Sequence, residues 1–543
     1  MLRKNMHQVN NENEKTQLYR TLLNLANITR GGADAWDIKQ YIFGLLFYRF
    51  ISSSLTNYIN KNERENGNSN FNYEDISDEE AKIFDFDENL IITEKGFFLK
   101  PSQLFINIAK NAAKNDNLNV DLEKVFKEIQ ESKHPENDTK IFAGLFSDLN
   151  FNNEKLGNSV KERNSLLVDV IEEIAQLKLG DFSKSNIDAF GDAYEFLMHF
   201  YAAKAGKGGG EYFTPQEVSD LLVQISLASI KIPNRGKLKV YDPTCGSGSL
   251  LLKFIKLAKS KEGIVIDHET GKKIRQDEII LYGQEKNHTT YNLSRMNMVL
   301  HYLDYDQYKI EHGDTLADPK HSLEQKYHII VSNPPYSADW KPSLLKDDER
   351  FQYAPLAPAS KADLAFIMHM NYVLANNGVA VIVCFPGVLY RDGVEKQIRE
   401  YLVSSSIDAV INLPNNLFYG TTIATSILVL NKAKKSDNII FIDASEQFYK
   451  DRNKNKLTKE NIDFIVDIYK NRKEIQNISK IATIDEIVEN EYNLSVSKYV
   501  IKTQEDEVKD IAELNRKIEE IVAKNDEYRQ KINEFIREFE EIE

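Results

Sequence analysis

A rigid corner follows one apolar segment of this 543-residue chain. The run from Tyr327 to Ser332 predicts a buried strand, and Asn333-Pro334-Pro335-Tyr336 comes directly after it. Neither proline has an amide hydrogen to donate, so no strand ladder can continue through this corner. An ordinary turn is the alternative interpretation, because Asn-Pro is a frequent turn signal.

The groups at this corner suit a flat ligand that has an amino group. The side-chain oxygen of Asn333 and the carbonyl of Pro334 can each accept a hydrogen bond from an –NH2 group. Two acceptors shift an amino nitrogen from planar towards tetrahedral geometry, so that its lone pair can attack. The ring of Tyr336 can stack on a base. The corner is therefore a candidate catalytic site, formed by Asn333, Pro334, Pro335 and Tyr336.

A glycine-rich turn supplies the second motif. Leu238 to Tyr241 predicts a strand, Asp242-Pro243-Thr244-Cys245-Gly246-Ser247-Gly248-Ser249 follows it, and Leu250 to Ala258 predicts a helix. Strand, glycine-rich turn and helix form the βα unit of a doubly wound nucleotide-binding sheet. A dinucleotide-binding turn would need a third glycine at position 251, which is Leu. A carboxylate at the strand end repels pyrophosphate and suits a cationic ammonium or sulfonium group.

Acidic residues also end the next two predicted strands. Glu285 follows the strand that begins at Ile279 and is placed to accept both hydroxyls of a ribose. Asp314 follows the strand that begins at Tyr308 and could accept from an adenine amino group. A role as helix caps is the alternative. Between the strands, Ser260 to Asp277 predicts an inserted hairpin or loop.

The segment before the glycine-rich motif begins with a flexible run, Ala205 to Gly210, that lacks the spacing of a P-loop. Glu211, Tyr212, Phe213, Thr214, Pro215 and Gln216 come next. Thr214 suits an N-cap and Pro215 a first helical residue, which predicts a helix to about Ser229. The segment is either a capped helix start or a lid that brings Tyr212, Phe213 and Thr214 to a ligand.

Strands and helices continue to alternate after the corner, which predicts an α/β fold with a mainly parallel sheet and possible late hairpins. The polar loop from Ser337 to Lys361 could contact DNA, cover the pocket or be an ordinary surface loop. Pro414 to Phe418 is expected to wall the pocket.

The two ends of the chain predict helices. Residues 14–165 have mostly helical apolar spacing, and the C-terminal segment has a heptad seam with Asn525 on it. The seam comprises Ile511, Leu514, Ile518, Ile521, Asn525, Tyr528, Ile532, Phe535, Phe539 and Ile542. A docking coiled coil is favoured over a helix packed on its own domain. We expect a helical domain over 1–165, an α/β domain over 166–480 and a helical tail over 481–543.

Composition limits the possible partners. The net charge of −14 argues against tight binding of nucleic acid by this chain alone, because phosphate contacts need Lys and Arg. A basic groove must then be local or shared with a partner. The 2 cysteines and 10 histidines form no zinc pattern, so we expect no metal. No signal peptide or bilayer-spanning run is evident, which favours a cytoplasmic protein without membrane contact.

The paired motifs Asp-Pro-x-x-Gly-x-Gly and Asn-Pro-Pro-Tyr resemble the signature of amino-directed, S-adenosylmethionine-dependent DNA methyltransferases. Essentially the whole chain resembles the modification subunit of type I restriction-modification systems, with that family's motifs in order and at its segment lengths. The similar segments are Glu211 to Gln216, Asp242 to Leu252, Gly283 to Asn287, His312 to Leu316, Asn333 to Tyr336, Asp363 to Phe366 and Leu413 to Phe418.

This resemblance implies a Rossmann-like methyltransferase sheet with an N-terminal helical domain and a C-terminal coiled-coil-like helix. It implies that Glu211 to Gln216 cover S-adenosylmethionine and that Asp242, Gly246, Ser247, Gly248 and Ser249 line its methionine part. Glu285 would hold the ribose, and Asp314 would lie near the adenine of the cofactor. The corner would bind a target adenine flipped out of double-stranded DNA, whose N6 attacks the methyl group.

The resemblance also implies partners. No basic module able to read base edges follows the sheet, so a separate specificity subunit would select the sequence. A second modification subunit completes the methylating complex, and a motor-nuclease subunit joins for restriction. Three rival functions are a methyltransferase acting on a protein amide or amine, an inactive scaffold that binds cofactor and partners, and a dinucleotide-dependent oxidoreductase.

Overall fold

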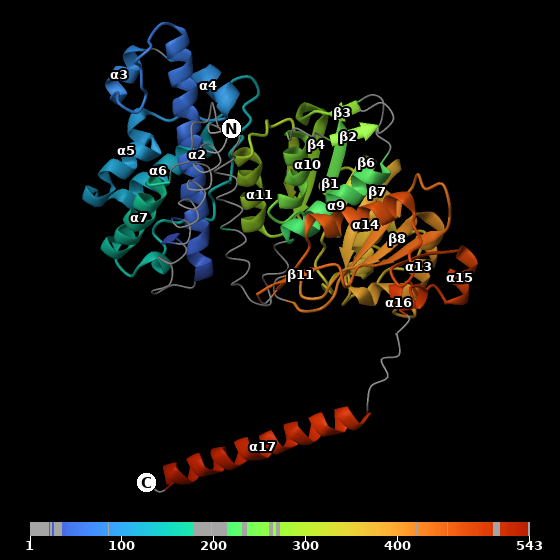
Figure 1. The fold of residues 1–543 in the computed structure, drawn as a ribbon. Coiled ribbons are helices and arrows are strands. Elements are labelled where there is room, and N and C mark those ends of the chain that lie inside the picture. The colour runs from blue at the N-terminus through green and yellow to red at the C-terminus, as the bar shows by residue number, and fades with distance from the viewer. Residues whose placement is uncertain are drawn as a thin grey trace, which may run out of the picture.

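A computed structural model describes most of the chain. The described residues are 21, 24–25, 35–84, 86–177, 197, 214–230, 236–259, 264–267, 272–418, 421–452, 454–502 and 511–540. Figure 1 shows a helical part, an α/β part beside it, and a long C-terminal helix apart from both.

The N-terminal part is helical, as the apolar spacing predicts. Its α-helices are α2 (Ala35–Glu65), α3 (Asp78–Ile83), α4 (Glu88–Lys95), α5 (Phe105–Asn111), α6 (Leu118–Glu131) and α7 (Val160–Ala175), with short 3-10 turns between α4 and α7. The long helix α2 is the centre of this bundle, because nearly every side chain between Tyr41 and Ile51 is buried. Leu293, Met296 and Leu300 of the α/β part join the same core, so apolar contacts attach the bundle to the sheet.

The α/β part is built on one sheet of nine strands in the order β13-β10-β8-β9-β7-β6-β1-β4-β5. The strands are β1 (Leu238–Asp242), β4 (Ile279–Glu285), β5 (Tyr308–His312), β6 (Tyr327–Ser332), β7 (Leu374–Cys384), β8 (Ile407–Asn412), β9 (Ser426–Asn431), β10 (Ile439–Asp443) and β13 (Ser479–Ala482). β7, β6, β1, β4 and β5 are parallel neighbours, whereas β9 runs antiparallel between β7 and β8. The predicted α/β fold with a late antiparallel element is therefore confirmed.

Helices cover both faces of the sheet. One face packs against α9 (Gln216–Ser229), α10 (Ser249–Lys259) and α14 (Lys459–Asn471), with α11 (His288–Leu300) beside them. The other face packs against α12 (Asp363–Val373), α13 (Val394–Ser405), α15 (Ile484–Glu489) and α16 (Val496–Tyr499). Because both faces are covered, the inner strands are continuous apolar runs rather than alternating ones.

Both expected domain boundaries fall inside secondary-structure elements. The expected boundary after residue 165 falls inside α7, and the one after 480 falls inside β13. Ile487 and Tyr499 pack into the sheet's second core, so the α/β part continues to about Val500. The inserted segment forms a small hairpin from β2 (Ile264–Asp267) and β3 (Lys272–Ile274), one of the two forms expected.

The heptad segment is a single helix, α17 (Ile511–Glu540). Its described apolar side chains are between 52% and 60% exposed at Ile518, Ile521, Val522, Tyr528 and Ile532. A helix packed on its own domain would bury these side chains, so their exposure does not support that alternative. Among the described residues, no helix is long and apolar enough to cross a membrane.

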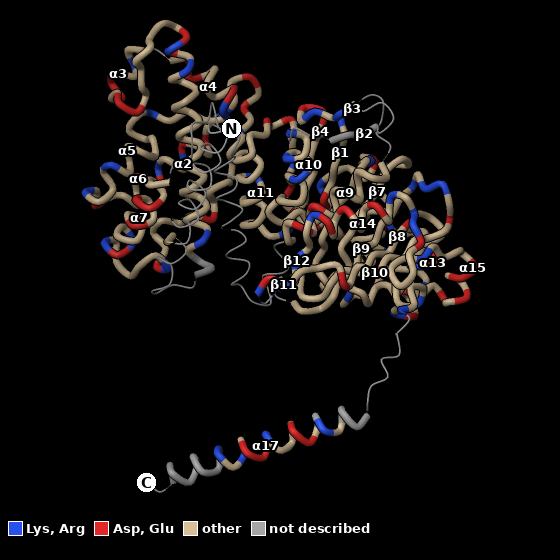
Figure 2. The backbone as a smooth tube through the Cα atoms, viewed as in Figure 1, with Lys and Arg blue, Asp and Glu red and all other residues tan. Residues whose placement is uncertain are grey.

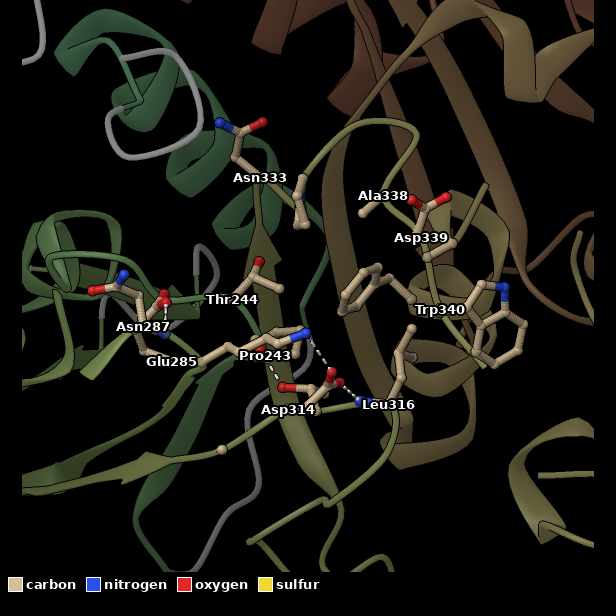
Figure 3. Close-up of a pocket in the computed structure, with 16 residues that line it drawn as sticks. Pro243, Thr244, Glu285, Asn287, Asp314, Leu316, Asn333, Ala338, Asp339 and Trp340 are labelled. Atoms are coloured by element: carbon tan, nitrogen blue, oxygen red, sulfur yellow. Dashed lines mark hydrogen bonds and ion pairs between the residues drawn. The ribbon is translucent and has the colours of Figure 1, made fainter. Parts of the chain in front are cut away.

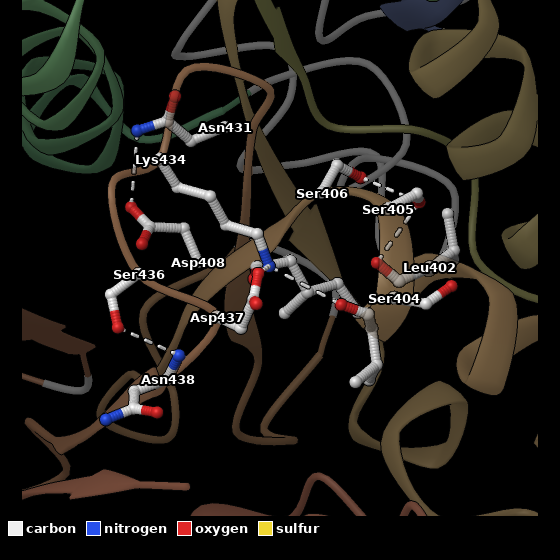
Figure 4. Close-up of polar contacts among 12 residues, drawn as sticks. Leu402, Ser404, Ser405, Ser406, Asp408, Asn431, Lys434, Ser436, Asp437 and Asn438 are labelled. Atoms are coloured by element: carbon white, nitrogen blue, oxygen red, sulfur yellow. Dashed lines mark hydrogen bonds and ion pairs between the residues drawn. The ribbon is translucent and has the colours of Figure 1, made fainter. Parts of the chain in front are cut away.

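A polar cluster lies at the amino end of β8 and the carboxyl end of the antiparallel β9, at the edge opposite the motifs. Lys434 donates to the carbonyls of Val403 and Ile407, at 3.5 and 3.2 Å, and so closes the end of α13 (Figure 4). Asp408 of β8 accepts from Arg472 at 2.9 Å and from Tyr469 at 2.8 Å. These groups form their hydrogen bonds with protein partners, so we infer that the cluster stabilises the fold.

Candidate active site

The carboxyl ends of β1, β4, β5 and β6 meet at one edge of the sheet, around a cavity of about 470 Å³ (Figure 3). Parallel strands place their carboxyl ends together, which is why motifs far apart in sequence come together here. The lining residues are Pro243, Thr244, Glu285, Lys286, Asn287, Gly313, Asp314, Thr315, Leu316, Asn333, Pro335, Ala338, Asp339, Trp340, Ala362 and Phe366. Glu285 and Asp314 lie on one side of the cavity, and Ala338, Asp339 and Trp340 lie on the other.

Asp242 lies beneath the cavity rather than in its lining. Its buried carboxylate accepts a hydrogen bond from the amide of Thr244 and another from Ser332 Oγ, both at 3.0 Å. Burial raises the pKa of Asp242 to about 7. Asp242 therefore ties the turn after β1 to the last residue of β6, and direct contact with a cofactor stays a prediction.

The glycine-rich turn has the backbone geometry that its glycines permit. Gly246 and Gly248 have φ of 54° and 74°, in the left-handed region. A Cβ on Gly248 would lie 2.5 Å from Met298 Cε, so the turn packs closely on α11. Pro243 and Thr244 line the cavity, whereas Gly246, Ser247, Gly248 and Ser249 are described but are not part of its lining.

Glu285 and the glycine-rich turn are joined. The Glu285 carboxylate lines the cavity and accepts from the amides of Gly246 at 3.0 Å and Asn287 at 2.7 Å. Burial raises its pKa above the ordinary value. Each carboxylate oxygen keeps a lone pair for a further donor, so a diol could still bind here.

Asp314 closes the turn after β5 and also lines the cavity. It accepts from the amides of Leu316 and Ala317 at 3.0 and 3.2 Å, and Lys286 Nζ lies 2.8 Å from its other oxygen. Burial alone would raise the pKa of Asp314, but Lys286 and the two amides hold it below the ordinary value. The capping role and the position in the cavity are thus compatible.

The Asn-Pro-Pro-Tyr corner is held by its own side chains. Asn333 Nδ2 donates to Thr214 Oγ1 at 3.3 Å, and Asn333 Oδ1 accepts from the Tyr336 hydroxyl at 2.8 Å. These two bonds set the orientation of the amide, so its oxygen is an acceptor held in place. Asn333 and Pro335 line the cavity; Pro334 is buried, and Tyr336 is half-buried against the sheet's first core.

The segment before α9 is divided between two places. Thr214 contacts the corner, whereas Pro215 and Gln216 line a second cavity of about 230 Å³. Pro215 is the N-cap residue, one position later than expected. Glu211, Tyr212 and Phe213 lie outside the described residues. Of the segment from Pro414 to Phe418, Leu417 lines the second cavity.

The polar loop after the corner covers the main cavity, which was one of its three expected roles. Ala338, Asp339 and Trp340 line the cavity on this side (Figure 3). The Trp340 amide donates to Ala359 at 2.8 Å, and its indole N–H donates to Pro358 at 2.9 Å. The loop is therefore an ordered wall of the cavity, apolar at Ala338 and Trp340.

The structure gives Arg350 a role that the sequence did not reveal. Its side chain is fully buried in this loop and is held by Asp348 at 2.7 Å. The guanidinium donates to the carbonyls of Thr315 and Leu316, at 2.9 and 2.6 Å, and both residues line the cavity. Arg350 thus fixes the wall beside Asp314 from behind. A single arginine in a polar loop has no spacing that could reveal this role.

Among the described residues, no cluster of His, Cys, Asp and Glu side chains could hold a metal ion. The polar groups of the main cavity are instead mainly carboxylates and amides, with Lys286 paired to Asp314. This set suits a ligand with hydroxyl and amino donors and a flat ring, since an anionic pyrophosphate would meet Glu285 and Asp314.

Two family models match the chain. The model described as N-6 DNA Methylase matches residues 185–508, and the HsdM N-terminal domain matches residues 18–174. The type I restriction enzyme MpnII methylase subunit of Mycoplasma pneumoniae is 46% identical over 95% of this chain and 94% of its own length. The MjaVII methylase subunit of Methanocaldococcus jannaschii is 30% identical over 94% of this chain and 82% of its own length.

Solved structures have the same fold. A type I restriction-modification system methyltransferase subunit from Streptococcus thermophilus has a TM-score of 0.77 at 32% identity, over 89% of this chain and 99% of that one. A chain from a structure of type I restriction-modification complex assembly has a TM-score of 0.61 at 18% identity, over 95% of this chain and 98% of that one.

The raised pKa of Asp242 predicts a pH dependence of stability. Between about pH 4 and pH 7 the folded chain holds a proton on Asp242 that the unfolded chain has released. This group's contribution to the free energy of unfolding is therefore present at low pH and lost as pH rises through about 7. Asp242→Asn should remove this decrease in the free energy of unfolding with rising pH. Urea unfolding at pH 5, 6 and 7, followed by a probe in the α/β part, measures the decrease. If the free energy of unfolding changes with pH in the same way in the unchanged chain and in the variant, the prediction is wrong.

The contacts of Arg350 predict an effect on the affinity for S-adenosylmethionine, the cofactor expected from the sequence motifs. Arg350→Gln should loosen the wall at Thr315 and Leu316 and weaken binding of S-adenosylmethionine on the order of 10-fold to 100-fold. Titration calorimetry measures this affinity directly.

Arg399→Gln is the matched control for Arg350→Gln. Arg399 is equally buried, at 2% exposure, but donates to Val388, Arg391 and Tyr492, which do not line the cavity. The control should be destabilised with unchanged affinity for S-adenosylmethionine. Equal affinities in both variants would remove Arg350 from the site.

Proposed function

The chain belongs to the methylase subunits of type I restriction-modification systems, and we propose that it transfers a methyl group from S-adenosylmethionine to N6 of adenine in double-stranded DNA. The observation that supports this chemistry best is the shared cavity of Glu285, Asp314 and Asn333. Two carboxylates that can accept from a nucleoside thus lie in the same cavity as an oriented amide that can accept from an amino group.

We assign the cofactor to the main cavity. Glu285 would accept from the ribose hydroxyls, and Asp314 would accept from the amino group of the cofactor's adenine. Leu316, Trp340 and Phe366 form the apolar wall against which that flat ring would pack. Glu211, Tyr212 and Phe213 are proposed to cover the bound molecule. When bound, S-adenosylmethionine supplies a methyl group on a positively charged sulfur.

The chain's own residues would prepare the target for attack. Asn333 Oδ1 has a second lone pair besides the one used by Tyr336, so it can accept from N6 while the amide stays oriented. The carbonyl of Pro334 is the proposed second acceptor. A base must leave the duplex to reach this corner, and the ring of Tyr336 is its proposed stacking partner. Catalysis is then mainly positioning and polarisation, because no nucleophilic side chain is required.

Sequence selection is assigned to a separate specificity subunit. The described apolar side chains of α17 are exposed from Ile518 to Ile532, on a helix 30 residues long, which suits a coiled-coil contact with that subunit. A second copy of this chain would complete the methylating complex, and a motor-nuclease subunit would join it for restriction.

The direct test is transfer of labelled methyl groups from S-adenosylmethionine to duplex DNA, followed by nucleoside analysis. The label should appear in N6-methyladenine when the specificity subunit is present. Label in protein alone would favour methylation of a protein amide. Sequence-specific methylation by the chain alone would contradict the assignment of DNA reading to a partner.

Asn333→Ala tests the corner in the same assay. The change removes the side-chain acceptor for N6, so the methylation rate should fall by about 100-fold or more. Affinity for S-adenosylmethionine should persist, because the carboxylates and the apolar wall are intact. Loss of cofactor binding together with activity would point to misfolding, and full activity would exclude Asn333 from catalysis.

A further inference from the structure

A small basic hairpin lies next to the proposed target site. Its strands are β11 (Tyr449–Asp451) and β12 (Lys454–Lys456), which pair antiparallel. From Phe448 to Lys456 the sequence has four Lys or Arg residues and a single acidic residue, Asp451, in a chain of net charge −14. In Figure 2 the hairpin projects from the α/β part with Lys and Arg in blue. Such a local excess of positive charge is what a shared DNA surface needs.

Two positive charges of the hairpin are exposed and can bind an anion. Asp451 is paired with Lys456 at 2.5 Å, so the one carboxylate is already neutralised. Lys450 and Arg452 are exposed, as are two aromatic neighbours, Phe448 at 38% and Tyr449 at 46%. Cations beside exposed aromatic rings are typical of nucleic-acid surfaces.

The hairpin is firmly attached to the loop that follows β8. Asn455 Nδ2 donates to the carbonyl of Asn415 at 2.9 Å, and the Asn455 amide donates to the carbonyl of Asn416 at 3.2 Å. Lys454 Nζ donates to Asn416 Oδ1 at 2.9 Å and to the carbonyl of Phe418 at 2.6 Å. These bonds make the hairpin and the loop one rigid unit.

This unit is close to the corner. Leu417 of the loop and residues 454–456 of the hairpin line the second cavity together with Pro215 to Glu217. Thr214, which precedes Pro215, accepts the hydrogen bond from Asn333. Glu217 lies inside this cavity, so an anion would bind outside it, at the exposed Lys450 and Arg452, which are not part of its lining.

The strand register places Lys450 on the loop side. Lys450 pairs with Asn455, so both side chains leave the same face of the hairpin, and Asn455 is the residue that bonds to Asn415. Arg452 is at the turn, with a left-handed φ of 53°. The two cations therefore extend from a rigid base beside the target site.

We propose that the β11–β12 hairpin binds backbone phosphates of duplex DNA beside the target adenine, through Lys450 and Arg452. This proposal rests on the proposed function, because it takes the flipped adenine at Asn333 as given. Phosphate contacts fix the register of a protein on DNA without reading its sequence. The hairpin would thus hold the duplex at the corner while the specificity subunit selects the site.

The test uses the complex of this chain with its specificity subunit and a duplex that contains the target. The variant is Lys450→Ala with Arg452→Ala, and its affinity is measured by fluorescence anisotropy over a series of salt concentrations. Losing two phosphate contacts should reduce the slope of log K against log salt by about 2. Affinity for S-adenosylmethionine should not change, because neither residue lines the main cavity.

A control of equal charge is Lys124→Ala with Lys127→Ala, two exposed residues on α6 of the helical part. The control should keep the salt slope, and Lys450→Arg with Arg452→Lys should keep it as well. Equal slopes for the hairpin variant and the α6 control would overturn the proposal. Loss of assembly with the specificity subunit would also overturn it, because the hairpin would then belong to the subunit interface.

The same data separate this proposal from the proposed function. If the unchanged complex neither binds the duplex nor methylates it, the proposed function fails and the hairpin proposal fails with it. If the unchanged complex binds and methylates while the hairpin variant behaves like the α6 control, only the hairpin proposal fails.

Discussion

The hydrogen bonds of one buried carboxylate connect the two halves of the candidate site. Asp242 ends β1, and it accepts from Thr244 in the turn after that strand and from Ser332 at the end of β6. Asn333 is the next residue after Ser332. The wall of the main cavity at Thr244 and the Asn-Pro-Pro-Tyr corner are therefore held at a fixed separation by one side chain. A methyl transfer between two bound molecules depends on such fixed positions more than on any reactive side chain.

Further contacts hold the other residues of the site in place. Glu285 bonds to Gly246 in the same turn, Asp314 is held by Lys286, and Arg350 holds the carbonyls of Thr315 and Leu316. Four residues of the cavity lining are thus each held by a second group: Glu285, Asp314, Thr315 and Leu316. This arrangement explains how an acidic chain can keep several buried carboxylates in one place, because each of them accepts hydrogen bonds from amides or cations.

The sequence predicts the centre of the site better than its surroundings. Asp242, Glu285, Asp314 and Asn333 could be placed together because each follows a predicted strand and parallel strands end at one edge. The position of Arg350 and the cover by Trp340 depend on how a polar loop folds back, which no periodicity encodes. The last strands were missed for a different reason. Ile439 to Ile442 is a β-branched and aromatic run that indicates a strand, but β10 is only 5 residues long and was not singled out within the expected α/β domain.

The most direct test of the site is a crystal structure of the chain with S-adenosylhomocysteine, the product of the proposed methyl transfer. We expect the ribose hydroxyls within about 3.2 Å of the Glu285 carboxylate. The adenine ring should pack on Leu316 and Phe366, and the sulfur should face Asn333. A ligand bound outside the main cavity, or one whose ribose does not contact Glu285, would contradict the assignment of this edge of the sheet to methyl transfer.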